Sequence, residues 1–266
     1  VSLASKAKKK MASFRIPAEE LGGVNDLRQL AEAEAVLLRR RIDQWMRDGV
    51  RIEAPANLWA DVTVEIEPGA VIGPNVVLRG RTFIGANAVV EAGCVLKDCA
   101  VEEGAQILAY SHLDEAKVRK SARVGPFGRL RPGAEIGEGA HIGNFVEVKK
   151  SRIGKGSKAN HLSYIGDAEI GEGVNVGCGF IACNYDGYNK HRTTIESGAF
   201  VGSGVSAVAP VTIGRDSYVA TGTVVNRDVP AGALAIARPK QENKEGYAER
   251  LRGRMQAAKK AAKENG

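Results

Sequence analysis

An aliphatic residue returns at every sixth position along most of this chain. One run occupies Ile66, Ile72, Leu78, Ile84, Val90 and Leu96, and a second occupies Ile195, Val201, Ala207, Ile213, Val219 and Val225. A period of six matches neither the repeat of a helix nor the alternation of a simple strand. It is typical of a parallel β-helix, in which each short strand buries one aliphatic side chain against the coils above and below.

The spacing also predicts how the coils close. Three six-residue units make one triangular coil, and the step falls to five residues at Leu96 to Val101, Leu113 to Val118, Val148 to Ile153 and Ile165 to Ile170. We expect about nine coils between Ile66 and Val225, stacked at roughly 4.8 Å. Narrow inner positions are expected at Val76, Ala88, Cys94, Ala140, Val174, Ser217 and Thr223. A β-sandwich with this spacing by chance is the alternative, and the number of repeats disfavours it.

The composition limits the classes of protein and partner. The chain has 266 residues, 44% of them hydrophobic, with no apolar run of 18 residues and no apolar signal region at the start. We therefore expect a soluble, cytoplasmic protein without membrane insertion. Four cysteines, Cys94, Cys99, Cys178 and Cys183, are few for a disulfide framework and match no common zinc spacing. Small buried thiols are the expectation.

The positive charge of the chain is concentrated in its tail. The formal net charge is +7, and the stretch from Arg238 to Gly266 contributes +5 of it. A basic tail suits nucleic acid or an acidic membrane surface, but this one has neither interleaved aromatic residues nor a recognition motif. We expect a solvated, partly helical tail and no nucleic-acid partner.

Two cations occupy equivalent positions in neighbouring coils. Arg131 follows Leu130 and Lys149 follows Val148, so the two side chains should stack at one corner. Like charges held together repel unless an anion lies between them, and a guanidinium with an ammonium suits a phosphate. Two solvated surface charges are the alternative.

A histidine occupies another repeated position. His161 follows Ala159 by two residues, and Cys178 follows Val176 by two in the next coil. We therefore expect the His161 side chain to lie against the Cys178 backbone. A neutral imidazole beside a backbone N–H suits a general base beside an oxyanion donor. A purely structural histidine stays open on this spacing alone.

Further polar residues surround these positions. Tyr164, Asn175 and Asn184 lie within the same two coils, and Asn184 begins a polar loop that interrupts the repeat up to Thr193. A long loop on a regular solenoid is typical of a binding element. The four histidines lack the paired spacing of zinc ligands in carbonic anhydrases of the β-helix type, so no metal site is predicted.

The segment from Gly125 to Thr193 closely resembles the acetyltransferase half of the bacterial bifunctional N-acetylglucosamine-1-phosphate uridylyltransferase and glucosamine-1-phosphate N-acetyltransferase. It contains the motifs RLRPG, EVKK, NHLSY and NYDG, which are more specific than the six-residue repeat. The similarity continues through VGSGVSAVAPVTIG and ALAIARP to KEGY, and backwards to GVNDLRQLAEAE. It covers nearly everything from Gly22 to Tyr247.

The resemblance implies a left-handed parallel β-helix that works as a homotrimer. The implied reaction moves the acetyl group of acetyl-CoA to the amine of glucosamine 1-phosphate, which supplies UDP-N-acetylglucosamine for peptidoglycan and lipopolysaccharide. His161 would be the general base. The residues implied to bind glucosamine 1-phosphate are Arg131, Lys149, Tyr164, Asn175 and Asn184. Those implied to bind acetyl-CoA are Cys178 (by its backbone N–H), Asn184, Tyr185, Ser203, Thr221 and Arg238.

The resemblance also implies a division of the chain. Residues 1–24 would be the end of a preceding uridylyltransferase domain, 25–49 a linker helix, 50–230 the β-helix acetyltransferase domain, and 231–266 a C-terminal arm with the basic tail. Asn25 is expected to cap the helix, with Gly49 past its end. The chain opens on Val1 and lacks the glycine-rich nucleotide motif of the uridylyltransferase half. We therefore expect a fragment or processed product without uridylyl transfer or its magnesium site.

The sequence departs from the family at three positions near the site. Cys178 and Thr221 stand where the family usually has alanine, and Asn160 replaces a glycine that often precedes the base. At Cys178 and Thr221 we expect backbone contacts to survive and the fit around the pantetheine to tighten. Two other functions stay open, namely another hexapeptide acyltransferase and a non-catalytic β-helix used for trimerisation.

Overall fold

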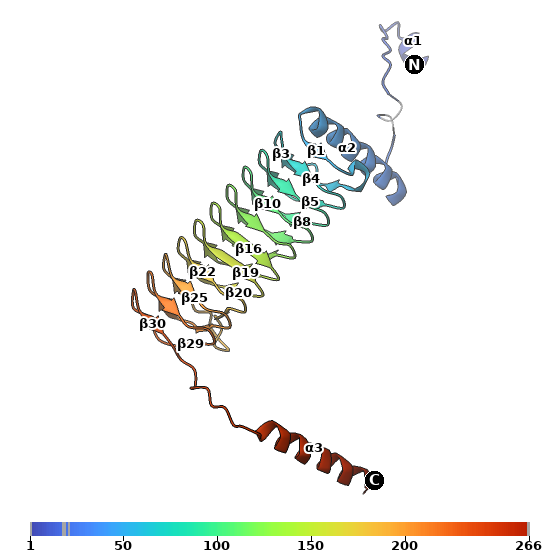
Figure 1. The fold of residues 1–266 in the computed structure, drawn as a ribbon. Coiled ribbons are helices and arrows are strands. Elements are labelled where there is room, and N and C mark those ends of the chain that lie inside the picture. The colour runs from blue at the N-terminus through green and yellow to red at the C-terminus, as the bar shows by residue number, and fades with distance from the viewer. Residues whose placement is uncertain (1, 18–19, 21, 265–266) are drawn as a thin grey trace. The chain divides into compact units, whose positions relative to one another are not determined.

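The computed structural model describes residues 2–17, 20 and 22–264 (Figure 1). The chain forms two compact units, of which the first ends at Ile236 and the second begins at Ala237. The first unit contains helix α1 (Ser2–Lys6), helix α2 (Leu27–Arg47), a short 3-10 helix (Pro55–Asn57) and all the strands. The second contains helix α3 (Tyr247–Glu264).

The strands form three parallel sheets, named A, B and C here, and all their described strands are given below. The 11 strands of sheet A are β1 (Arg51–Ile52), β4 (Val71–Ile72), β7 (Val89–Val90), β10 (Gln106–Ile107), β13 (Arg123–Val124), β16 (His141–Asn144), β19 (Lys158–His161), β22 (Asn175–Val176), β25 (Phe200–Val201), β28 (Tyr218–Val219) and β30 (Leu234–Ala235). The 10 strands of sheet B are β2 (Trp59–Ala60), β5 (Val77–Arg79), β8 (Val95–Lys97), β11 (His112–Asp114), β14 (Arg129–Leu130), β17 (Glu147–Lys149), β20 (Tyr164–Gly166), β23 (Ile181–Cys183), β26 (Ser206–Val208) and β29 (Val224–Val225). The 9 strands of sheet C are β3 (Glu65–Ile66), β6 (Phe83–Ile84), β9 (Ala100–Val101), β12 (Lys117–Val118), β15 (Glu135–Ile136), β18 (Arg152–Ile153), β21 (Ala168–Ile170), β24 (Thr193–Ile195) and β27 (Val211–Ile213).

Each coil takes one strand from sheet C, one from sheet A and one from sheet B, and the next coil repeats the order. The predicted β-helix is therefore confirmed, and it is the left-handed form. The five-residue steps all fall at the corner between sheets B and C, as from Leu96 on β8 to Val101 on β9. The stack begins earlier and ends later than the repeat from Ile66 to Val225 indicates, because β1, β2 and β30 extend it.

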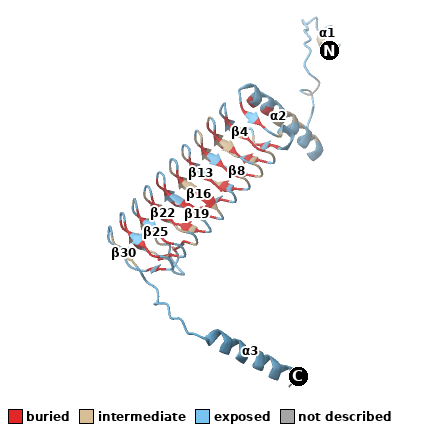
Figure 2. Ribbon diagram, in the orientation of Figure 1, coloured by how far each residue is buried: buried red, intermediate tan, exposed pale blue. Residues whose placement is uncertain are grey.

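The core is a set of aliphatic columns inside the coils. Figure 2 shows that buried residues recur from coil to coil along the rod. Leu96 stacks on Leu113, and Leu113 stacks on Leu130, through the paired strands of sheet B. The seven predicted inner positions are all buried, each with 0 or 1% of its surface exposed. Interlocked side chains of neighbouring coils thus exclude water along the whole rod.

The prediction of buried thiols holds for only part of the cysteines. Cys94 and Cys99 are buried, and burial raises the pKa of each thiol to about 11. Cys183 is half-buried and Cys178 is exposed, so the prediction was wrong for Cys178. That residue lies in a corner outside the aliphatic columns, where the coil spacing places its side chain at the surface.

Helix α2 packs against the first coil of the rod. Ile42 and Trp45 are its two buried residues among those described, and both join the main core. Asp26, and not Asn25 as expected, is the N-cap, because its carboxylate accepts a hydrogen bond from the Gln29 N–H at 2.7 Å. The expected Gly49 follows the helix with φ of +94°, a conformation that suits glycine.

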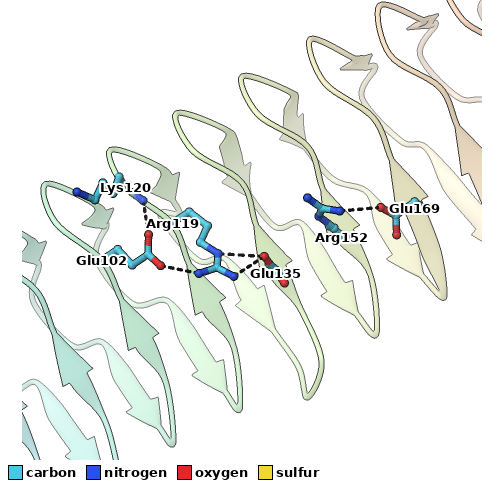
Figure 3. A network of polar contacts seen from close by, with 6 residues as sticks. All are labelled: Glu102, Arg119, Lys120, Glu135, Arg152 and Glu169. Carbon is cyan, nitrogen blue, oxygen red and sulfur yellow. Dashed lines mark hydrogen bonds and ion pairs between the residues drawn. The ribbon is translucent and has the colours of Figure 1, made fainter.

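Sheet C carries a column of alternating charges (Figure 3). Arg119 contacts Glu102 at 2.6 Å and Glu135 at 2.7 Å, and Arg152 contacts Glu169 at 3.6 Å. These partly exposed pairs are worth about 0.2–1 kcal/mol each. The outer face of sheet C is thus locally neutralised by pairs between coils.

Helix α3 forms most of the second unit. Six basic residues lie along it, and its large apolar residues Tyr247, Leu251 and Met255 are exposed. No described helix is long and apolar enough to cross a membrane. Arg238, expected to bind acetyl-CoA, belongs to this second unit.

Candidate active site

One corner of the rod, between sheets A and B, brings His161 into a column with three other expected site residues. In successive coils the column contains Asn144, His161, Cys178, Ser203 and Thr221. The Gly179 N–H donates to the His161 carbonyl at 3.3 Å, and the Gly204 N–H donates to the Cys178 carbonyl at 2.7 Å. These hydrogen bonds hold the coils in register, so each residue lies directly beside the next.

Asn144, which lies next to His161 in the preceding coil, determines which ring nitrogen of the neutral His161 carries the proton. Asn144 pairs with His161 in the register of β16 and β19, and its Oδ1 lies 3.0 Å from His161 Nδ1. The neutral tautomer that donates from Nδ1 to this oxygen leaves Nε2 with a free lone pair. His161 is exposed, so Nε2 can accept a proton from a bound molecule.

The coil after His161 offers a hydrogen-bond donor. Among the described residues, nothing accepts a hydrogen bond from the Cys178 N–H. The residues after Cys178, Ser203 and Thr221 are Gly179, Gly204 and Gly222, all at positive φ. A Cβ added at Gly204 or Gly222 would meet nothing within 4 Å. The corner below His161 therefore presents backbone groups beside a strip free of side chains.

The other edge of sheet B carries the predicted pair of cations. The Arg131 N–H donates to the Val148 carbonyl at 2.9 Å, which places Arg131 beside Lys149 in the next coil. Arg131 also contacts Glu147 at 2.7 Å. A third cation, Lys190, comes from the loop. Lys190 is the largest cause that lowers the pKa of Lys149, followed by burial and Arg131.

Between these two edges, Tyr164 and Asn184 converge on Gly166. A Cβ added at Gly166 would lie 2.6 Å from Tyr164 Cζ and 2.9 Å from Asn184 Nδ2. Asn184 is buried, and its Nδ2 donates to Asp167 Oδ2 at 2.5 Å. Because Gly166 pairs with Lys149, both side chains lie next to the cation cluster of Arg131, Lys149 and Lys190.

Asn175 does not join this group within one chain. It lies on β22 of sheet A, paired with Lys158 and Phe200, whereas Tyr164 lies on sheet B. The expectation that Tyr164, Asn175 and Asn184 serve one site stays a prediction, and a single rod places Asn175 on another sheet than Tyr164. Two residues of one coil can face different directions, since each coil turns through three faces.

The polar loop is a compact hairpin around Asp186. Its carboxylate accepts from the Asn189 N–H at 2.6 Å and lies 2.7 Å from His191 Nε2, and these contacts lower the pKa of Asp186. The Tyr185 hydroxyl donates to the Gly187 carbonyl at 2.5 Å. This internal bonding holds Lys190 and Tyr185 on an ordered segment beside sheet B.

Sequence reasoning did not single out Asn144, Asp167 or Lys190. The signal for Asn144 was its place one coil before His161, seventeen residues earlier. Lys190 carried no such signal, because the loop lies outside the repeat. Within residues 2–17, 20 and 22–264, no three His, Cys, Asp or Glu side chains gather in a way that could hold a metal ion.

We predict that Lys190→Gln raises the pKa of Lys149 toward the ordinary lysine value. The substitution removes the cation that most strongly disfavours protonation of Lys149. NMR titration of isotopically methylated lysines measures the change, and Lys150→Gln is the matched control that leaves the Lys149 pKa unchanged. An unchanged Lys149 pKa in Lys190→Gln contradicts the proximity of the two ammonium groups.

The same shift has a consequence for anion binding. A lowered pKa means that Lys149 loses its charge at a lower pH than an ordinary lysine. Affinity for a phosphate at this edge should therefore fall as pH rises through the Lys149 pKa.

Comparisons with known proteins agree with the fold and the motifs. No family model matches the chain. The chain is 51% identical over 261 residues to the "Bifunctional protein GlmU" of Sorangium cellulosum, covering 97% of this chain and 55% of that protein. It is 47% identical over 245 residues to the protein of the same name from Thermus thermophilus, covering 92% of this chain and 54% of that protein. The chain spans about half the length of the curated relatives it matches.

A solved structure with the same fold is the UDP-N-acetylglucosamine acyltransferase of Francisella novicida. Its TM-score is 0.51 at 18% identity, and the match covers 75% of this chain and 73% of that chain. This likeness concerns the stacked coils. The sequence identity to the curated relatives shows that the chain belongs to the GlmU family, and the solved structure shows that its stacked coils have the β-helix fold.

Proposed function

We propose that this chain transfers the acetyl group of acetyl-CoA to the amine of glucosamine 1-phosphate and that it works as a homotrimer. The product, N-acetylglucosamine 1-phosphate, would serve UDP-N-acetylglucosamine synthesis. One observation carries the proposal. His161 and the cation cluster lie at opposite edges of sheet B, with Tyr164 between them.

The spacing along sheet B suits a sugar phosphate. Tyr164 and the Gly166 position next to Lys149 are two residues apart, or roughly 7 Å along the strand. In this proposal the phosphate lies against Arg131, Lys149 and Lys190, while Tyr164 and Asn184 contact the sugar. Charge-assisted hydrogen bonds from three cations favour a dianionic phosphate over a neutral hydroxyl.

In the chemical step His161 first accepts a proton from the amine and later gives a proton to the CoA thiolate. His161 Nε2 takes a proton from the amine as its nitrogen attacks the thioester carbonyl carbon. The Cys178 N–H donates to the oxyanion that forms on the carbonyl oxygen. The carbon–sulfur bond then breaks, the amide forms, and the proton held by His161 passes to the CoA thiolate. Asn144 keeps the ring in the tautomer that begins this cycle.

Acetyl-CoA would lie along the open strip below His161. Gly179, Gly204 and Gly222 leave room there for an extended pantetheine, and its amides can reach backbone groups of Ser203 and Thr221. Asn184 and Tyr185, which follow β23 at the other edge of sheet B, are also proposed to bind acetyl-CoA. Arg238 is also proposed to bind acetyl-CoA, as the resemblance implies.

The place of Asn175 supports an assembly of several copies. A site that contains both Tyr164 and Asn175 needs sheet B of one copy and sheet A of another. In a cyclic assembly every copy offers both faces, so each interface completes one site.

We predict CoA release with glucosamine 1-phosphate and far less with glucosamine. A thiol-detection assay under initial-rate conditions should give a kcat/KM lower by about 10²-fold or more for glucosamine, because charge-assisted hydrogen bonds to the phosphate are lost. Equal rates with both amines would contradict the role of the cation cluster. Absence of CoA release with glucosamine 1-phosphate would contradict the proposed reaction.

We predict that His161→Ala lowers kcat about 10²- to 10⁴-fold, the usual cost of losing a general base. His112→Ala, an exposed histidine on sheet B away from the site, is the matched control and should keep its activity within about twofold. A loss smaller than about threefold in His161→Ala, where chemistry limits the rate, would show that His161 is not the base.

A further inference from the structure

Helix α3 is amphipathic. Tyr247, Leu251 and Met255 are spaced by four residues, so their side chains lie on one side of the helix. Ala258 and Ala262 continue the same side at steps of three and four residues. We name these five residues the apolar face of α3. In a globular unit, a face of this kind usually packs against a core.

The apolar face of α3 is open within the second unit. Every residue from 237 to 263 is exposed, and Figure 2 shows helix α3 as exposed. The exposed fractions are 45% for Tyr247, 38% for Leu251 and 62% for Met255. Removing apolar side chains from water is favourable, so a helix face that its own unit leaves open is available to another surface.

Basic residues border the apolar face of α3 on both sides. Arg250 and Arg254, four residues apart, lie along one border. Arg252, Lys259 and Lys263 lie along the other, at steps of seven and four residues. The helix carries six basic residues and two acidic ones. Its positive charge is therefore concentrated along the two borders of the apolar face.

We propose that helix α3 binds an anionic lipid bilayer, lying parallel to the membrane surface with its apolar face turned toward the acyl chains. Leu251 and Met255 enter the boundary between headgroups and acyl chains, and the bordering arginines and lysines contact the acidic headgroups. Long basic side chains suit this arrangement, because their methylene stems lie along apolar surface while their charges reach the headgroups. Such binding needs no helix that spans the membrane. It is independent of the acetyl transfer proposed above.

The arrangement of residues on α3 favours lipid over two other partners. Nucleic acid would use the positive charge alone and leave the apolar face in water. A second copy of α3 would cover the apolar face, but the basic borders of the two helices would then face each other and repel. An anionic bilayer satisfies the charges and the apolar face together.

Co-sedimentation of the full chain with lipid vesicles tests the proposal. We expect binding to vesicles of about equal parts phosphatidylglycerol and phosphatidylcholine, and at least about tenfold weaker binding to phosphatidylcholine alone. Binding to the mixed vesicles should fall as salt rises from about 0.05 M to about 0.5 M, because salt screens the charges. If the chain does not bind the mixed vesicles at the lower salt concentration, the proposal is wrong.

Variants of α3 separate the apolar face from the charge. Leu251→Gln with Met255→Gln keeps the charge and the helix propensity, and it should weaken binding to the mixed vesicles about tenfold or more. Arg250→Gln with Arg254→Gln should weaken it roughly 30-fold, the effect of two basic residues at an anionic surface. The matched control is Ala257→Gln, off the apolar face, which should bind within about twofold of the wild type.

Two outcomes would overturn the role of the apolar face, in variants whose folding is confirmed by circular dichroism. The first is a Leu251→Gln, Met255→Gln variant that binds the mixed vesicles as tightly as the wild type, since charge alone would then explain the binding. The second uses duplex DNA of about 20 base pairs as the ligand. Tighter binding of the wild type to this duplex than to the mixed vesicles, with no loss in the same variant, would assign α3 to nucleic acid.

Discussion

The parallel hydrogen-bonded register between coils is the constraint on which the site depends. Because of this register, residues that are one coil apart in the sequence lie side by side, as Asn144 and His161 do, and Leu130 and Val148. Each coil buries one aliphatic residue on each sheet, so a shift of one residue would turn those side chains outward. The columns of outer residues are therefore as fixed as the core, and a catalytic arrangement can be assembled one residue per coil.

The faces of the rod differ in what their outer columns do. Sheet C alternates acids and bases, and Arg119 and Arg152 are paired across coils. At the edge of sheet B, Arg131 is paired with Glu147, whereas Lys149 lies beside Lys190 and its pKa is lowered as a result. Charges that lack full compensation in the fold are available to a ligand. The proposed phosphate site is the place where the rod concentrates positive charge beside a candidate base.

Much of this architecture could be predicted from the sequence because it is periodic. The six-residue repeat and its five-residue steps predicted the coils, and the same counting placed Arg131 beside Lys149 and Cys178 one coil from His161. Counting by the six-residue repeat could not predict contacts of residues that lie outside the repeat. Lys190 depends on how a loop folds around Asp186, and the cap at Asp26 depends on a single side-chain hydrogen bond.

Counting coils did not predict the face of Asn175, for a different reason. Membership of a coil says how high a residue lies on the rod, whereas its place within the coil says which way it faces. Asn175 precedes a buried residue of sheet A, and Tyr164 precedes one of sheet B. Functional grouping by coil alone ignored this difference, and the difference is what points to a site shared between copies.

The central claim is that one site takes His161 from one copy and Asn175 from another. The most direct measurement is the activity of mixed assemblies made by refolding His161→Ala and Asn175→Ala chains together, with mixing confirmed by native mass spectrometry. Random mixing at equal ratio should give about one quarter of the sites both native residues, and CoA release should rise well above that of either variant alone. Activity that never exceeds the separate variants, in assemblies shown to be mixed, would contradict the shared site.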